Sequence, residues 1–260
     1  MKYGLPKLAK TGEPVSFKTM ASAVYTADGK TAQDHLDYLN NIKANDSENT
    51  VSNMKLGILG DGIIVDSGNN SLIQLLRNHF FSCESYSDYG ITVAYKEGNN
   101  ISDRPLCLYY ASMNDNLDII LVYATSNDWY YSVPLGAKSD TNNTTYYGAL
   151  NNLILGLQTK FPERPIFFIT PIPSMYINEN NRHTEMPNDE GLVLKDYIAV
   201  VKEVCEYHTV PVIDLFSNCG MNIVHNENHR NYYTVNGTHL SSAGHMKFYK
   251  YIFNELMLKI

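Results

Sequence analysis

Residues 55–62 read KLGILGDG, a short apolar run that ends in two glycines around one aspartate. The run Leu56–Leu59 has the length and apolar character of a strand that is buried on both faces. A loop follows, and then an amphipathic pattern predicts a helix around Ser71–His79. Strand, loop and helix in this order form the repeating unit of a parallel sheet.

The same alternation continues to the end of the chain. Three further apolar stretches predict strands, at Asp118–Tyr123, Pro165–Thr170 and Val210–Phe216. Helical patterns follow them, at Tyr146–Lys160, about Glu190–Tyr207 and Ser242–Leu258. We therefore expect an α/β domain whose helices cover both faces of a parallel sheet. In such a sheet the functional site lies beyond the carboxyl ends of the strands.

Residues 1–53 differ from the rest. A turn at Ala27–Lys30 leads into a short amphipathic helix, Thr31–Ile42, in which Thr31 and Asp34 are spaced as in a capping box. Residues 43–53 are polar and read as a linker. So short a helix is marginal alone, so we expect a partner surface, such as its copies in a homo-oligomer, plausibly a trimer. The predicted division is an attachment segment, 1–53, and a domain, 54–260.

The composition argues against several classes of function. A net charge of -7 leaves no basic surface for nucleic acid or anionic lipid. We expect no membrane span, because no apolar run reaches about 18 residues, and no secretory signal at the N-terminus. The four cysteines form no CxxC pair, so no structural zinc, other metal or cofactor is expected. His225 and His229 have the spacing of a zinc pair but belong to an Asn-rich stretch that reads as a solvated loop.

Tyrosine is abundant, with 20 residues against one Trp. A surface rich in Tyr and Asn suits contact with sugars or partner proteins, although an AT-rich genome produces the same bias. Adjacent residues cannot share one face of a strand or helix, so one member of each tyrosine pair is expected near the mouth of a groove. The pairs are Tyr130 and Tyr131, Tyr146 and Tyr147, and Tyr232 and Tyr233.

Four polar segments lie where site residues are expected. They are Ile58–Gly62, Asp88–Ile91, Thr125–Asp128 and Asn236–His245. In this order and spacing they resemble the sequence blocks of the SGNH (GDSL-type) hydrolase family over roughly 200 residues. The resemblance implies a three-layer α/β/α, flavodoxin-like domain.

The family transfers acyl groups from esters, often acetyl groups on sugars. A serine attacks the carbonyl, three N–H donors hold the oxyanion, and a histidine oriented by an aspartate acts as base. Carried over to this chain, the resemblance puts Gly62 at the nucleophile position and His239 at that of the base. Gly90 and Asn127 match oxyanion donors, with the backbone of Gly62 as the third. Asn236 matches the orienting aspartate.

Three of these positions depart from the family pattern. Gly62 has no side-chain oxygen, Asn236 has no charge, and Thr125 replaces a glycine. In other serine hydrolases, loss of the nucleophile costs about a million-fold in turnover, and an orienting Asp changed to Asn costs about 10⁴-fold. Ser67 and Ser85 are weak substitutes, since neither lies in the strand-to-helix turn. We therefore expect a catalytically degenerate domain.

The remaining residues predict a binding cradle. The donors of Gly62, Gly90 and Asn127 would converge beside His239, in a site enlarged by the missing hydroxymethyl group. Asp61 is expected to fix its loop by accepting backbone N–H groups. Asp128, its counterpart beside Asn127, is expected to support the site or to cap the segment that follows.

The N-terminal stretch Val24–Leu36 is similar to the lead-in of phage tail, fibre and baseplate proteins. This resemblance implies a virion component that contacts other virion proteins and acts at the host cell surface. The leading interpretation is a domain that binds host polysaccharide or teichoic acid. The alternatives are an active carbohydrate esterase, with an unusual nucleophile or a histidine-activated water, and a purely architectural virion protein.

Overall fold

The computed structural model describes residues 31–34, 37, 51–65, 71–97 and 105–260. The chain divides into two units, Met1–Val51 and Ser52–Ile260. In the first unit, Ala32–Asp34 is helical, the N–H of Thr31 donates to Oδ2 of Asp34 (2.8 Å), and the N–H of Asp34 donates to Oγ1 of Thr31 (3.0 Å). The predicted capping box is confirmed. The turn at 27–30 and the linker at 43–50 lie outside the described residues.

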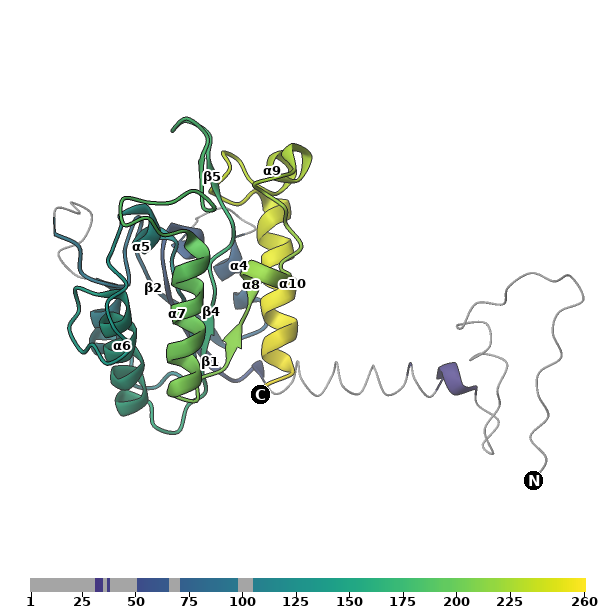
Figure 1. The fold of residues 1–260 in the computed structure, drawn as a ribbon. Helices are drawn as coiled ribbons and strands as arrows, with labels where there is room; N and C mark the ends of the chain where they lie inside the picture. Colours follow the sequence, from purple (N-terminus) through teal and green to yellow (C-terminus); the bar gives the residue numbers. More distant parts are fainter. Residues whose placement is uncertain (1–30, 35–36, 38–50, 66–70, 98–104) are drawn as a thin grey trace, which may run out of the picture. The chain divides into compact units, whose positions relative to one another are not determined.

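The second unit is built on a five-stranded parallel sheet with the order β2-β1-β3-β4-β7 (Figure 1). Its strands are β1 (Lys55–Gly60), β2 (Ser82–Ser87), β3 (Ile119–Tyr123), β4 (Ile166–Ile169) and β7 (Val212–Ile213). The strands predicted at 56–59, 118–123 and 165–170 are confirmed. The strand predicted at 210–216 is shorter, because the Asp214 side chain accepts the N–H of Ser217 and starts helix α8 (Leu215–Asn218).

Helices cover both faces of this sheet. They are α4 (Leu72–Arg77), α6 (Tyr146–Lys160), α7 (Leu194–Tyr207) and α10 (Ser242–Met257). Helix α6 packs against α7, and α10 packs against α4 (Figure 1). Alternate residues of β3 face the two layers: Val122 joins the core with α6 and α7, whereas the Tyr123 ring contacts Phe248 of α10. The three-layer α/β/α fold predicted from the sequence is confirmed.

Helix α7 starts four residues later than predicted. The side chain of Asn188 accepts the N–H groups of Glu190 and Leu192, and Gly191 between them has φ +75°. This turn holds residues 188–192 out of the helix.

Shorter elements complete the second unit: α3 (Gly62–Val65), the 3₁₀ helix η1 (Leu106–Ser112), α5 (Asn127–Tyr130), the antiparallel hairpin of β5 (Met175–Tyr176) and β6 (Arg182–His183), and α9 (Glu227–Tyr233). The sequence patterns above did not predict the hairpin. Among the described residues, no helix is both long and apolar enough to cross a membrane.

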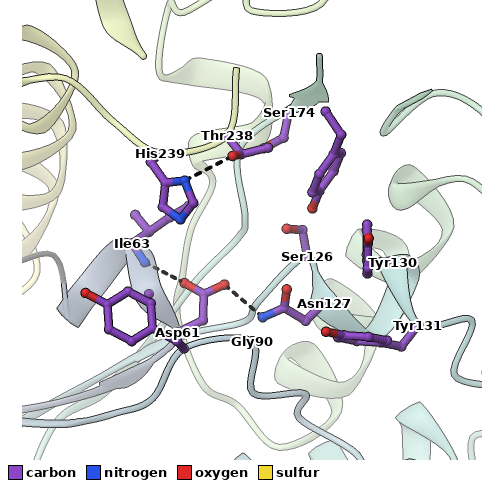
Figure 2. Close-up of a pocket in the computed structure, with 13 residues that line it drawn as sticks. Asp61, Ile63, Gly90, Ser126, Asn127, Tyr130, Tyr131, Ser174, Thr238 and His239 are labelled. Atoms are coloured by element: carbon purple, nitrogen blue, oxygen red, sulfur yellow. Dashed lines mark hydrogen bonds between the residues drawn. The ribbon is translucent and has the colours of Figure 1, made fainter. Parts of the chain in front are cut away.

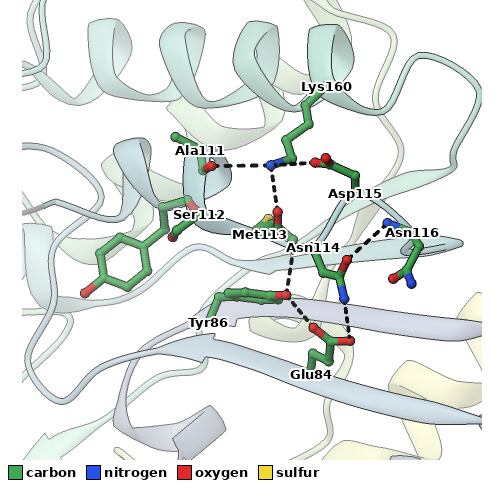
Figure 3. Close-up of polar contacts among 10 residues, drawn as sticks. Glu84, Tyr86, Ala111, Ser112, Met113, Asn114, Asp115, Asn116 and Lys160 are labelled. Carbon is green, nitrogen blue, oxygen red and sulfur yellow. Dashed lines mark hydrogen bonds and ion pairs between the residues drawn. The ribbon is translucent and has the colours of Figure 1, made fainter.

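The edge strand β2 was not recognised as a strand because its sequence, SCESYS, is mostly polar. Polar contacts join it to the loop after η1 (Figure 3). The Tyr86 hydroxyl donates to Glu84 and accepts the N–H of Asn114 (2.9 Å). Lys160 of α6 donates to the carbonyl of Met113 (2.6 Å) and pairs with Asp115 (3.0 Å). The loop that leads into β3 is thereby tied to both the sheet edge and α6.

Candidate functional site

A pocket of about 260 Å³ lies at the carboxyl edge of the sheet (Figure 2). Segments that follow β1, β2, β3 and β4 meet there with the segment before α10, because parallel strands all end at one edge. The lining residues are Asp61, Gly62, Ile63, Tyr89, Gly90, Ser126, Asn127, Tyr130, Tyr131, Ser174, Tyr176, Thr238 and His239. The structure thus brings together Gly62, Gly90, Asn127 and His239, along with Asp61.

Asp61 lies at the floor of the pocket, where β1 turns into α3. Its Oδ1 accepts the N–H of Ile63 (3.0 Å), and its Oδ2 accepts Nδ2 of Asn127 (3.3 Å). The first contact fixes the loop in the way the sequence predicted. Burial raises the pKa of Asp61 to about 7. Near neutral pH this carboxyl is therefore divided between its acid and its ionised form.

Gly62 follows Asp61, and the Tyr89 ring lies over it. A Cβ atom built at position 62 would be 2.6 Å from Cδ1 and 3.0 Å from Cε1 of Tyr89. The expectation of an enlarged site is therefore wrong, since an aromatic ring takes the space of the absent side chain. Tyr89 is 48% exposed, so the protein packs against only one side of the ring. Gly90 next to it has φ +66°, a conformation that favours glycine.

Asn127 does not present a free amide to the pocket. Its Nδ2 donates to Asp61 and to the carbonyl of Ile91 (2.8 Å), which uses both amide hydrogens. Figure 2 shows the nitrogen of Asn127 pointing toward Asp61. The side-chain donor predicted for a ligand is therefore already engaged within the protein.

Thr125 braces this arrangement. Its Oγ1 accepts the N–H of Asn127 (3.0 Å) and donates to the carbonyl of Ile91 (3.1 Å). The residue noted as a departure from the family pattern thus ties the end of β3 to the loop after β2.

Asp128 does not line the pocket and does not cap the helix that follows. Its buried carboxylate accepts the N–H groups of Val93 (2.8 Å) and Ala94 (3.0 Å). Burial raises its pKa to about 7. Its support for the site is indirect, through the loop that follows Gly90.

Asn236 holds both the backbone and the ring of His239. Its Oδ1 accepts the N–H groups of Thr238 (3.2 Å) and His239 (2.9 Å), and its Nδ2 lies 2.9 Å from Nδ1 of His239. Nδ1 of His239 also lies 3.2 Å from Oδ1 of Asn236 and 3.2 Å from Oγ1 of Thr238. Since Nδ2 is the nearest of these atoms, we assign it as donor to Nδ1. The proton of the neutral ring is then on Nε2, the nitrogen that points toward Asp61 in Figure 2. In this tautomer Nε2 is a donor and cannot act as a base.

Aromatic rings form the opposite side of the pocket. The rings of Tyr130 and Tyr176 contact each other with centroids 4.9 Å apart and planes tilted by 35°. The guanidinium of Arg182 lies 4.8 Å from the ring of Tyr130 and 4.9 Å from that of Trp129, so it fastens the β5–β6 hairpin onto α5. The sequence did not reveal this hairpin, because its two strands have only two residues each and are too short to show a strand periodicity.

The tyrosine pairs behave differently from one another. Both Tyr130 and Tyr131 line the pocket, whereas the expectation was one of the two. Tyr146 is fully buried beside Tyr197 of α7. Tyr232 is 65% exposed and does not line this pocket.

The histidine pair at zinc-site spacing makes other contacts. His225 pairs with Glu185 (2.8 Å), and Nδ1 of His229 accepts the N–H of Asn222. Among the residues that the structure describes, no group of three or more His, Cys, Asp or Glu side chains is arranged to hold a metal ion.

No protein-family model matches the chain, and no curated protein matches it. Several solved structures, however, match the chain. A Lactobacillus plantarum protein is 24% identical with a TM-score of 0.71, over 81% of this chain and 99% of its own. A protein described as a GDSL-like lipase, from Bacteroides uniformis, is 18% identical with a TM-score of 0.57, over 78% and 95%. The lipase/acylhydrolase of Enterococcus faecalis is 18% identical with a TM-score of 0.52, over 79% and 96%. The chain therefore has the fold of GDSL-like lipases and acylhydrolases.

Proposed function

We propose that this domain binds carbohydrate in the pocket and does not hydrolyse esters there. The observation that carries the proposal is the pair of Gly62 and Tyr89. The turn after β1 offers no oxygen nucleophile, and an aromatic ring lies where one would project.

The state of the other polar groups supports binding over catalysis. Both amide hydrogens of Asn127 are donated within the protein, and in the tautomer assigned above His239 carries its proton on Nε2. The pocket lining includes four tyrosines and His239, and two buried serines, Ser126 and Ser174, whose hydroxyls bond to Tyr176 and to the carbonyl of Ile172. Sugars offer hydroxyl groups for hydrogen bonds and apolar C–H faces for aromatic rings, so this lining suits them.

The proposal extends to the setting of the domain. The stretch Val24–Leu36 resembles the lead-in of phage tail, fibre and baseplate proteins. We infer that residues 1–53 attach the chain to other virion proteins, in a homo-oligomer, and that the domain acts at the host cell surface. Cryo-electron microscopy of virions purified from cells that produce this chain tests the inference, and virions that lack the chain would refute it.

An esterase is the second candidate, and Asp61 is the observation in its favour. This buried carboxyl has a pKa raised to about 7 and lies in the same pocket as His239. A carboxylate with such a pKa has the basicity to activate water near neutral pH.

Two assays on the purified protein separate the candidates. The first follows hydrolysis of 4-nitrophenyl acetate, and the second follows binding to acetylated and unacetylated cell-wall polysaccharide by calorimetry. We expect binding, with no turnover above that of the His239→Ala variant. Turnover that is lost in Asp61→Asn or His239→Ala would establish the esterase instead. Absence of both activities would favour a purely architectural domain.

A further inference from the structure

We propose that the ligand is an uncharged sugar chain of at least two residues, which extends from the pocket past His239 into a second chamber. This inference rests on the proposed function and specifies its ligand.

The second chamber has a volume of about 270 Å³ and adjoins the first, since the two have lining residues in common. Tyr176, Thr238 and His239 line both chambers. The residues that line only the second are Ile177, Asn178, Glu179 and Asn236. Sites for drug-sized ligands measure roughly 300–1,000 Å³, so each chamber alone falls below this range, while the two together lie within it.

Polar groups of the β5–β6 turn connect the two chambers. The hydroxyl of Tyr130, from the first, donates to Oε1 of Glu179 in the second (2.9 Å). Asn178 adds an amide group to the second chamber, and Asn236 adds the amide hydrogen that it does not direct at His239. Amides and carboxylates bind sugar hydroxyls, because they accept or donate hydrogen bonds in pairs. The second chamber thus offers binding chemistry of its own.

The charge of the residues that line the two chambers distinguishes between a neutral polysaccharide and a phosphate-containing polymer as the ligand. The residues described around the two chambers include the carboxyls of Asp61 and Glu179 and no Lys or Arg. The nearby Arg182 is held against the rings of Trp129 and Tyr130. Phosphate groups are bound most strongly by the positive charges of Arg and Lys, and carboxylates repel them. A neutral polysaccharide therefore fits this cleft, and a polyphosphate such as teichoic acid does not.

Calorimetry with graded ligands tests this inference. The probes are neutral oligosaccharides of one to six residues, built from glucose, galactose, rhamnose and their N-acetylated forms, and polyglycerol phosphate. We expect affinity to rise at least about ten-fold from one residue to two, and no binding of polyglycerol phosphate. The Glu179→Gln and Asn178→Ala variants should lose most of that gain while their affinity for single sugars stays unchanged. Glu163→Gln, an exposed change of the same charge outside both linings, is the control.

The outcomes separate this inference from the proposed function. Equal affinity for single sugars and longer chains would overturn it, and so would binding of polyglycerol phosphate in preference to the neutral chains. In both cases carbohydrate binding at the first chamber would stand. Failure of every carbohydrate to bind would overturn the proposed function and this inference together.

Discussion

At position 62, the ring of Tyr89 occupies the space that a side chain of residue 62 would need. The Tyr89 ring packs against the bare backbone of Gly62, at a distance that no Cβ atom tolerates. The glycine therefore allows an aromatic ring to line the pocket beside Asp61. Backbone strain is no obstacle to substitution, as Gly62 does not have a positive φ.

A double-mutant cycle checks this pairing. Gly62→Ala should weaken carbohydrate binding about ten-fold, or about 1.4 kcal/mol, because the new methyl group displaces the Tyr89 ring. Tyr89→Ala should weaken binding by a similar factor. In the Tyr89→Ala background, Gly62→Ala should add almost nothing. Calorimetry on the four proteins measures the coupling, and simple additivity of the two effects would contradict the contact.

A serine introduced at position 62 should not by itself produce hydrolysis. Gly62→Ser meets the Tyr89 ring and a His239 ring whose Nε2 carries the proton. A carboxylate at position 236 would instead accept Nδ1–H and free Nε2 to act as base. The triple variant Gly62→Ser, Asn236→Asp, Tyr89→Ala should therefore turn over 4-nitrophenyl acetate. It should be about 10³- to 10⁴-fold faster than Gly62→Ser alone. Equal rates for the two would show that the tautomer is not the barrier.

At the scale of elements, the β5–β6 hairpin shapes the site without belonging to the sheet. It contributes Tyr176 to both chambers and is fastened to α5 by Arg182. The guanidinium also donates to the carbonyl of Tyr130 (3.2 Å). A planar cation suits this place, since it stacks on rings and donates from its edge at the same time.

Removing this cation should loosen the hairpin. Arg182→Ala should lower the free energy of unfolding by about 1–2 kcal/mol, through two lost cation–π contacts and a hydrogen bond. It should also speed proteolysis in the turn at 177–181. Arg182→Lys keeps the charge without the planar stack and should recover only part of both effects. Unchanged proteolysis in Arg182→Ala would show that the hairpin is held by other contacts.

At the scale of the molecule, the buried carboxyls give stability an unusual pH dependence. Burial raises the pKa of Asp61 and that of Asp128 to about 7, from ordinary values of 3.8. Between about pH 4 and 7 the folded protein therefore holds more protons than the unfolded chain, so stability falls as pH rises. The lowered pKa of His208 acts in the opposite direction near pH 6, and the buried pair should outweigh it.

Denaturant unfolding at pH 5 and pH 8 measures this effect. We expect the free energy of unfolding to be larger at pH 5 by an amount on the order of a few kcal/mol. Asp61→Asn should remove about half of the difference, and the exposed Asp189→Asn should leave it intact. A protein that is more stable at pH 8 would show that the two carboxyls stay ionised when buried.

Much of this architecture could be predicted from local pattern. Apolar runs such as Ile119–Tyr123 and the helical period of Tyr146–Lys160 are properties of neighbouring residues, and the boundaries of α6 agree with the prediction. The meeting of Gly62, Gly90, Asn127 and His239 in one pocket followed from topology, because parallel strands end together. The strand β2 could not be predicted, because its sequence is mostly polar. As an edge strand it is held by polar side-chain contacts and does not require apolar residues.

Which polar groups of the pocket are already hydrogen-bonded, and which space is already filled, depends on residues that lie far apart in the chain. Asn127 gives its amide to Asp61, 66 residues away, and to Ile91, 36 residues away, and Tyr89 turns its ring over Gly62. Short-range patterns show which backbone segments are strands and where these end. They do not show how side chains from different strand ends compete for the same hydrogen-bond partners and the same space. That competition is settled only when the folded chain brings them within contact, as it brings the Tyr89 ring over Gly62.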